Sequence, residues 1–311
     1  AHDGYDSATG SNSVGRVNVI QSIRGNDFSM LTVVGNGVVA LQGQTNSLRD
    51  EPNQIRHFTL LGGELLLDRS VPTQPADIRR THENQNPTLT LAGGDVAFLS
   101  RAAQTEVFSS NLTVRAGDSR VEVRSQSAVA DLAVATGPGA TVTRQRGGTV
   151  QFTEDSSLGG TAQIRLAGTG VTVGGRVGSW ATYGTNYRSG AFTWASTDAS
   201  SNVIAFGEGG YNVNSFGAAN HVHLDGAPPI FVTNEAAASL RYTNATALDL
   251  GGWGLDVVEG GILVTPTVGG AASIGNGQLT SSGGELILHN YADASGRSEE
   301  RRVGKECRSR W

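Results

Sequence analysis

The amino-acid sequence predicts an all-β protein, and more specifically a right-handed, single-stranded parallel β-helix (β-solenoid) of roughly 10–12 coils. Three observations support this fold class: a glycine-rich turn followed by a strand recurs along the chain, apolar residues alternate with polar ones, and no dozen-residue window keeps helical spacing. The recurring unit is clearest at residues 61–67, 92–98 and 281–288, with looser copies at 116–118, 146–150 and 259–264. Glycine supplies the turn, and period two buries one face of the strand that follows.

Eighteen strand cores are predicted, each marked by apolar residues at positions i and i+2. In chain order they are Val17/Val19, Leu31/Val33, Val39/Leu41, Leu65/Leu67, Leu89/Leu91, Val96/Phe98, Leu112/Val114, Val121/Val123, Leu132/Val134, Val150/Phe152, Ile164/Leu166, Val171/Val173, Ile204/Phe206, Ile230/Val232, Leu240/Tyr242, Leu248/Leu250, Ile262/Val264 and Leu286/Leu288.

The spacing of the turns favours stacked coils over a sandwich or a barrel. Gly62, Gly93, Gly117 and Gly147 are separated by 31, 24 and 30 residues, which is room for two or three strands and their turns. Such coils would place one continuous ladder of side chains inside, while Gln151 would point outward. The predicted ladder includes Leu65, Leu67, Phe98, Val150, Phe152, Ile262 and Leu286.

Two stretches and both ends of the chain depart from this repeating pattern of turns and strands. Residues 69–87, with three prolines, and residues 183–202, rich in Ser, Gly and Asn, are predicted to be loops on the side of the solenoid. Residues 297–311 resemble a translated sequencing adapter and hold the only lysine and the only cysteine, so the predicted β-helix domain is 1–296. Because the chain opens without Met or a signal peptide, we expect an internal piece of a longer protein.

Composition excludes several classes of partner. Removing the six basic and three acidic residues of 297–311 from totals of 23 and 28 leaves 17 basic and 25 acidic residues, a net charge of −8. A basic stripe for nucleic acid or an anionic membrane is therefore not expected. Residues 1–296 contain no cysteine for a disulfide, a thiolate or a metal site, and no apolar run of about 18 residues predicts a membrane-crossing helix.

One segment could bind a metal ion. On a strand, His221, His223 and Asp225 would share a face and could offer two imidazoles and a carboxylate. The favoured interpretation is that they are solvated outward residues, so no metal, cofactor or catalytic residue is assigned. The acidic pairs Asp50-Glu51 and Glu154-Asp155 would alternate to opposite faces of a strand and make poor acid/base partners.

Three tryptophans raise the question of sugar binding. Trp180, Trp194 and Trp253 could form an aromatic platform for a glycan if two or more were exposed and coplanar. The favoured interpretation is that they pack against neighbours or cap turns instead.

Six segments of the chain carry a family resemblance: residues 146–152, 171–182, 192–194, 202–206, 260–269 and 277–289. Together they resemble bacterial autotransporter-associated β-strand-repeat proteins, and the resemblance covers about residues 90–296 well and 1–90 loosely. It implies an exported β-helical passenger, joined in larger relatives to an outer-membrane β-barrel. The stretch 183–190 is longer than the usual turn of that family.

We therefore expect a non-catalytic structural or adhesive passenger, a monomeric rod at the cell surface that contacts surface glycans or the surfaces of host or neighbouring cells. The alternatives are a β-helical polysaccharide lyase or hydrolase and a carbohydrate-binding module. Three or more carboxylates converging in a groove beside an arginine would favour the enzyme. Turns lined only by Ser, Thr and Asn would favour the passenger.

Overall fold

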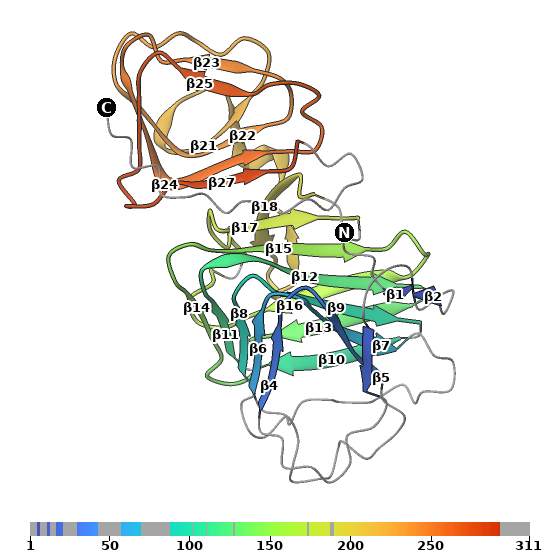
Figure 1. Ribbon diagram of the computed structural model, residues 1–311. Coiled ribbons are helices and arrows are strands. Elements are labelled where there is room, and N and C mark those ends of the chain that lie inside the picture. Colours follow the sequence, from blue (N-terminus) through green and yellow to red (C-terminus); the bar gives the residue numbers. More distant parts are fainter. Residues whose placement is uncertain are drawn as a thin grey trace. The chain divides into compact units, whose positions relative to one another are not determined.

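The computed structural model describes residues 5–6, 11–12, 17–20, 30–42, 57–69 and 88–292, except 102, 110, 127, 173 and 187–189 within the last range. The chain divides into two compact units, each built almost entirely of β-strands (Figure 1). Unit 1 comprises residues 1–176, 185–188 and 197–204, and unit 2 comprises residues 177–184, 189–196 and 205–311.

Unit 1 contains three parallel sheets, named here sheets I, II and III. Sheet I is formed by β3 (Val17–Ile20), β5 (Val38–Gln42), β7 (Glu64–Arg69), β9 (Asp95–Ser100), β12 (Gly117–Ser125) and β15 (Gly148–Asp155). Sheet II is formed by β4 (Met30–Val34), β6 (His57–Leu61), β8 (Thr88–Leu91), β11 (Asn111–Val114) and β14 (Thr141–Arg144). Sheet III is formed by β10 (Gln104–Ser109), β13 (Val129–Val134) and β16 (Thr161–Leu166). The short strands β1 (Tyr5–Asp6) and β2 (Ser11–Asn12) pair antiparallel.

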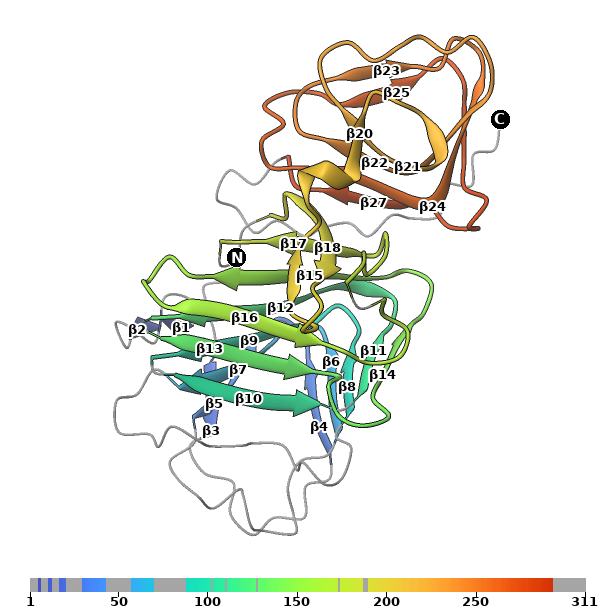
Figure 2. The same cartoon turned by 180° about the vertical axis from the view of Figure 1, so that it is seen from behind.

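The chain visits the three sheets in a repeating order. It passes from β8 through β9 to β10, then from β11 through β12 to β13, and then from β14 through β15 to β16. Figure 2 shows β10, β13 and β16 side by side as the members of sheet III. The predicted all-β class is confirmed, and the mostly parallel sheets are compatible with a β-helix.

The core of unit 1 follows from the period of two. Parallel register places Leu65 beside Val96, Val96 beside Val121 and Val121 beside Phe152, and all four side chains are fully buried. Because alternate residues of a strand point to opposite faces, such rows bury one face of sheet I completely. The predicted inward positions in unit 1, from Leu65 to Phe152, are confirmed.

Glycine permits the turns of successive strands to stack closely. Gly93 and Gly117 have φ values of 84° and 135°, which other residues rarely adopt. A Cβ atom on Gly117 would lie only 2.5 Å from the backbone nitrogen of Gly93. The recurring glycine therefore serves both the turn and the close approach of neighbouring backbones.

Unit 2 contains a parallel sheet IV and a two-stranded sheet V. Sheet IV is formed by β20 (Tyr211–Val213), β21 (Gly217–Leu224), β22 (Glu235–Tyr242) and β24 (Gly254–Val264), with β26 (Gln278–Thr280) and β27 (Ile287–Asn290) both paired to β24. Sheet V is formed by β23 (Ala247–Asp249) and β25 (Ser273–Gly275). The row Val222–Leu240–Ile262 belongs to its buried core.

Shorter elements precede sheet IV. Strand β17 (Ala181–Gly184) pairs antiparallel with β18 (Thr193–Thr197) and is followed in the chain by β19 (Val203–Ala205) and the 3₁₀ helix η2 (Glu208–Gly210). Within the described ranges, no helix is long and apolar enough to span a membrane.

Two predicted strand cores have the wrong face or the wrong structure. Leu286 and Leu288 are exposed, whereas Ile287 and His289 between and after them are buried. The run is apolar at consecutive positions, so the period of two could not assign its face. Ile230 and Val232 lie outside any strand and are exposed, while Phe231 is buried.

Two further cores are also displaced. In β19 the buried residue is Val203, and Ile204 is partly exposed. Val171 lies outside the strands, and Val173 lies outside the described residues.

The prediction for Gln151 is wrong in one respect. Gln151 does point away from the inward row of Phe152, but its side chain is fully buried and its amide donates to Thr153 Oγ1 at 3.1 Å. The outward face of sheet I is therefore covered at this position.

The predicted side loops have different outcomes. Residues 183–202 are not all loop, because β17 reaches Gly184 and β18 occupies 193–197. Arg69 ends β7, and residues 70–87 lie outside the described residues, as does the segment 297–311.

Candidate functional sites

The histidine segment does not gather into a ligand set. His221 and His223 lie on β21, where Nδ1 of His221 is 3.0 Å from Ser239 Oγ. Asp225 follows the strand and accepts a hydrogen bond of 2.5 Å from Asn244 Nδ2. Each of these three residues thus contacts a different neighbour, and the described part of the chain contains no group of three metal-binding side chains.

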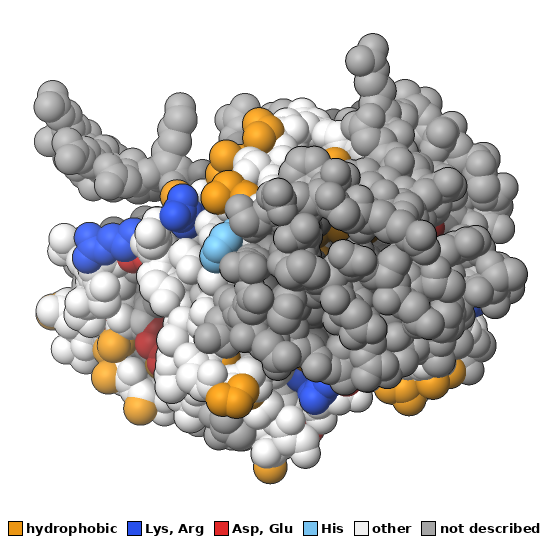
Figure 3. All heavy atoms as spheres, turned by 90° about the horizontal axis from the view of Figure 1, so that it is seen from below, with side chains coloured by type: hydrophobic (Ala, Val, Ile, Leu, Met, Phe, Trp, Pro, Cys, Tyr) orange, Lys and Arg blue, Asp and Glu red, His pale blue; other side chains and the backbone are white. Residues whose placement is uncertain are grey.

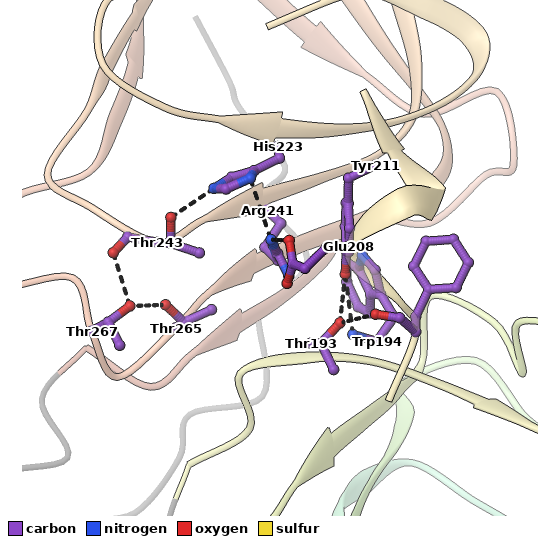
Figure 4. A network of polar contacts seen from close by, with 10 residues as sticks. Thr193, Trp194, Glu208, Tyr211, His223, Arg241, Thr243, Thr265 and Thr267 are labelled. Atoms are coloured by element: carbon purple, nitrogen blue, oxygen red, sulfur yellow. Dashed lines mark hydrogen bonds and ion pairs between the residues drawn. The ribbon is translucent and has the colours of Figure 1, made fainter. Parts of the chain in front are cut away.

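His223 instead belongs to a polar network in unit 2 centred on Arg241 of β22 (Figure 4). Parallel register places Val213, His223 and Arg241 in one row across β20, β21 and β22. The guanidinium donates to both carboxylate oxygens of Glu208, at 2.8 and 2.5 Å. It also lies over the ring of Tyr211, with Cζ 3.8 Å from the ring centroid, which is a cation–π arrangement.

The hydrogen bonds of His223 define its protonation. Its Nδ1 lies 3.3 Å from Nη2 of Arg241, which can only donate, so Nδ1 accepts and the proton is on Nε2. Nε2 then donates to Thr243 Oγ1 at 2.7 Å. Burial and the Arg241 charge lower the pKa of His223, which keeps the imidazole neutral.

The remaining contacts extend the same network. Tyr211 Oη lies 2.8 Å from Thr193 Oγ1, and the backbone N–H of Trp194 points at it from 3.4 Å (Figure 4). Burial raises the pKa of Tyr211. The Arg241 side chain is 2% exposed, whereas that of Glu208 is 71% exposed, and the Arg241 hydrogen bond lowers the pKa of Glu208. The network neutralises the charge of a buried arginine, which suits a structural role. We call Arg241, Glu208, Tyr211 and His223 together the Arg241 clamp.

Sequence reasoning missed this clamp because it depends on pairing between strands. Glu208 and Arg241 are 33 residues apart. The only local signal is the arginine between Leu240 and Tyr242, where alternation places it on the opposite face from two core residues.

A second polar constellation lies on the outward face of sheet I. Register places Glu64 beside Asp95 and Asp95 beside Arg120, on β7, β9 and β12. Arg120 Nε is 4.0 Å from Asp95 Oδ2, and its Nη1 is 3.5 Å from Glu122 Oε1. Asp118 lies on the same strand and accepts a hydrogen bond of 2.9 Å from Thr149 Oγ1.

These neighbours change the titration of Asp95. Burial raises its pKa to about 7; Arg120 opposes this rise, and the carboxylates of Glu122, Glu64 and Asp118 add to it. A carboxylic acid that stays protonated near neutral pH, beside a carboxylate, is the arrangement used for general acid catalysis of glycoside cleavage. Access is limited: the Asp95 side chain is 22% exposed, and Glu64 and Glu122 are buried.

The acidic pairs noted in the sequence lie elsewhere. Asp50-Glu51 is outside the described residues. Glu154 Oε1 accepts the backbone N–H of Ile164 at 2.6 Å, and Asp155 accepts that of Ser157 at 2.8 Å, so both carboxylates are occupied by turn and strand backbone.

The three tryptophans do not form an exposed platform. Trp194 is fully buried and meets His289 edge to face, with ring centroids 5.6 Å apart. Trp180 is half-buried, and Trp253, in the turn after β23, is 43% exposed. A pair of coplanar exposed indoles is therefore absent from these three residues.

Comparisons with known proteins leave the function open. No family of known proteins, no curated protein and no solved structure matches the chain.

Proposed function

We propose that the chain is a structural and adhesive passenger segment of an exported bacterial surface protein, of the kind found in autotransporter-associated β-strand-repeat proteins. In this proposal its sheets are the faces of a right-handed β-helix of roughly 10–12 coils. The segment acts outside the cell, anchored through a domain beyond this chain, and contacts glycans or cell surfaces.

One observation carries this proposal: parallel strands of unit 1 pair in register, and the outward face of sheet II carries a column of uncharged threonines, with the exposed apolar residues Met30, Val34 and Leu61 at its β4–β6 end. Thr90, for example, pairs with Thr59 on one side and with Thr113 on the other. Such a surface needs no cofactor and can make many weak contacts, which suits adhesion. The mostly parallel all-β architecture agrees with a repeat passenger.

Surface display tests the proposal. The chain is fused upstream of an outer-membrane translocator in a Gram-negative host bacterium, with the translocator alone as the control. We expect the chain to be labelled by antibody on intact cells, to be removed by added protease, and to increase adhesion to glycan-coated or cell-coated surfaces. Retention inside the cell, or display with adhesion equal to the control, would contradict the proposal.

The Asp95 constellation supports a second candidate function, cleavage of a polysaccharide. Asp95 would act as the general acid, Glu64 or Glu122 as the base or nucleophile, and Arg120 would stabilise the negative charge of a uronate or of the transition state. The buried carboxylates favour the passenger over this candidate.

An activity screen separates the two functions. The purified chain is incubated with polyuronates, β-glucans and chitin, and new reducing ends and unsaturated products are measured. An enzyme would lose its activity in Asp95→Asn and keep it in Asp225→Asn, an exposed carboxylate of unit 2. The passenger proposal expects no product from any substrate.

A further inference from the structure

The outward face of sheet II carries a continuous column of threonines. The five strands of this sheet lie side by side in the order β14, β11, β8, β6 and β4 (Figure 1). Each strand contributes one threonine, and each threonine is paired directly with the next by the strand register. In order along the sheet they are Thr32, Thr59, Thr90, Thr113 and Thr143.

A second column runs parallel to the first, two residues earlier on each strand. It begins with the exposed, apolar Met30 on β4 and is polar from His57 onward. An isolated parallel bridge continues it from Thr141 to Thr169. The described members of this column are Met30, His57, Thr88, Asn111, Thr141 and Thr169. Strands β8 and β14 thus present Thr-x-Thr, and β11 presents Asn-x-Thr.

Neighbouring members of this second column hold each other in place. His57 Nδ1 lies 2.8 Å from Thr88 Oγ1, and Thr141 Oγ1 donates to Asn111 Oδ1 at 3.0 Å. The backbone N–H of Thr141 donates to the same oxygen at 2.9 Å.

The array stands on a rigid support and faces outward. All members of both columns are exposed or half-buried. The residues between them, such as Leu89 and Leu112, are completely buried in the core of unit 1. Threonine is stiff at χ1, so its methyl and hydroxyl groups stay where the backbone places them.

The geometry of parallel strands gives the array two fixed repeats. Neighbouring strands are about 4.8 Å apart, and residues i and i+2 of one strand are about 6.6 Å apart. The result is a regular two-dimensional array. Its first column carries only threonine hydroxyl and methyl groups, and its second column also carries Met30, His57 and Asn111. The two columns contain no Asp, Glu, Lys or Arg. Figure 3 shows the molecule from below, where a few charged side chains lie among hydrophobic and other uncharged ones.

This array complements an uncharged solid surface of regularly spaced hydrogen-bonding groups. A nucleic acid or acidic polymer would need cations, and a protein partner would need large apolar anchors at the centre of its site. Ice has no charge, and its water molecules repeat at spacings close to those of this array. Methyl groups order the adjacent water, and the hydroxyls hydrogen-bond it in position. We propose that the outward face of sheet II binds ice.

The proposal does not rest on the adhesive passenger function, because it depends only on sheet II of unit 1. If both hold, the surface to which the passenger adheres includes ice. A chain that binds ice and is not displayed on cells would contradict the first proposal alone, and a displayed chain without affinity for ice would contradict this one alone.

Ice-affinity partitioning and inhibition of ice recrystallisation test the proposal with the purified full chain. The natural chain should enter a slowly growing ice ball and keep ice grains small. The double variant Thr90→Lys/Thr113→Lys puts two charged side chains at the centre of the array, and its activity in both assays should fall by roughly tenfold or more. Thr161→Lys, at an exposed threonine on β16 of sheet III, is the matched control and should retain full activity.

A second variant distinguishes loss of the hydroxyls from misfolding. Thr90→Val/Thr113→Val replaces each hydroxyl with a methyl group and keeps β-branched residues that favour strands, so it should fold and still lose activity. Circular dichroism melts establish that each variant is folded. Exclusion of the natural chain from ice, full activity of either double variant, or retention on crystalline cellulose or chitin without any effect on ice would overturn the proposal.

Discussion

At the residue scale, an inward side chain of sheet I packs beside the same position on the neighbouring strands. Phe152 lies beside Val121, and both are fully buried. Gln151, on the other face of the same strand, is also fully buried. The effect of a substitution on stability therefore depends on two things: the face of sheet I to which the side chain points, and whether that face is covered.

Phe152→Asp should lower the free energy of unfolding by about 4 kcal/mol or more, because it removes a large apolar side chain and buries an unpaired carboxylate. Urea denaturation followed by circular dichroism measures the change. Thr161→Asp, at an exposed position on a strand, should cost less than about 0.5 kcal/mol. Equal losses in the two variants would show that Phe152 is not part of a packed core.

The Arg241 clamp predicts an asymmetry between its two ends. Glu208→Gln leaves a buried arginine without its counter-charge and should cost about 1–3 kcal/mol. Arg241→Met leaves an exposed carboxylate that water solvates, so it should cost less than Glu208→Gln. Denaturant titration of both single variants and the double variant gives the order and the coupling energy. The reverse order would mean that packing of the guanidinium on Tyr211 outweighs the ion pair.

At the scale of the element, glycine turns decide how closely strands can stack. Gly117 and Gly139 both have positive φ, at 135° and 73°. Their surroundings differ: a Cβ atom on Gly117 would lie 2.5 Å from Gly93 N, whereas one on Gly139 would have no atom within 4 Å. Gly139→Ala therefore has only a backbone cost, whereas Gly117→Ala combines a less accessible φ with a clash.

Gly139→Ala should cost about 1 kcal/mol, the penalty for a non-glycine residue in this conformation. Gly117→Ala should cost clearly more, because the backbone of the neighbouring turn must also move. Thermal denaturation of the two variants measures the difference. Similar melting temperatures would show that the stacked turns tolerate a side chain.

At the scale of the whole molecule, the outward row on sheet I couples stability to pH. The pKa of Asp95 is raised from 3.8 to about 7. Between these values the folded chain binds more protons at this site than the unfolded chain. The contribution of Asp95 to stability must therefore fall as the pH rises from about 4 to about 7.

Asp95→Asn should remove this contribution to the pH dependence and make the chain more stable than the natural one above pH 7. Denaturation at a series of pH values, compared between the two proteins, measures the effect. Arg120, Glu122, Glu64 and Asp118 face the same group and remain in the variant. Superimposable pH profiles would show that Asp95 titrates at its ordinary pKa in the folded chain.

Much of the fold was predictable because its signals are local. Alternation identified the inward residues of unit 1, such as Leu65 and Phe98, and glycine spacing indicated strands that pair with neighbours some 25–30 residues away. The same reasoning failed at Leu286 and Leu288, where consecutive apolar residues carry no period. It also failed at Ile230 and Val232, which are exposed outside any strand while Phe231 between them is buried.

The sequence by itself determined the strand-and-turn character of the chain and the face to which most side chains point, because backbone alternation and glycine conformation act over a few residues. Tertiary structure alone decided which outward residues meet: the column through Thr90 and Thr113, the row of Glu64, Asp95 and Arg120, and the burial of Gln151. Register between strands and the covering of a sheet are set by contacts between residues tens of positions apart. No local pattern in the chain encodes those contacts, and so the candidate sites became visible only once the strands were paired.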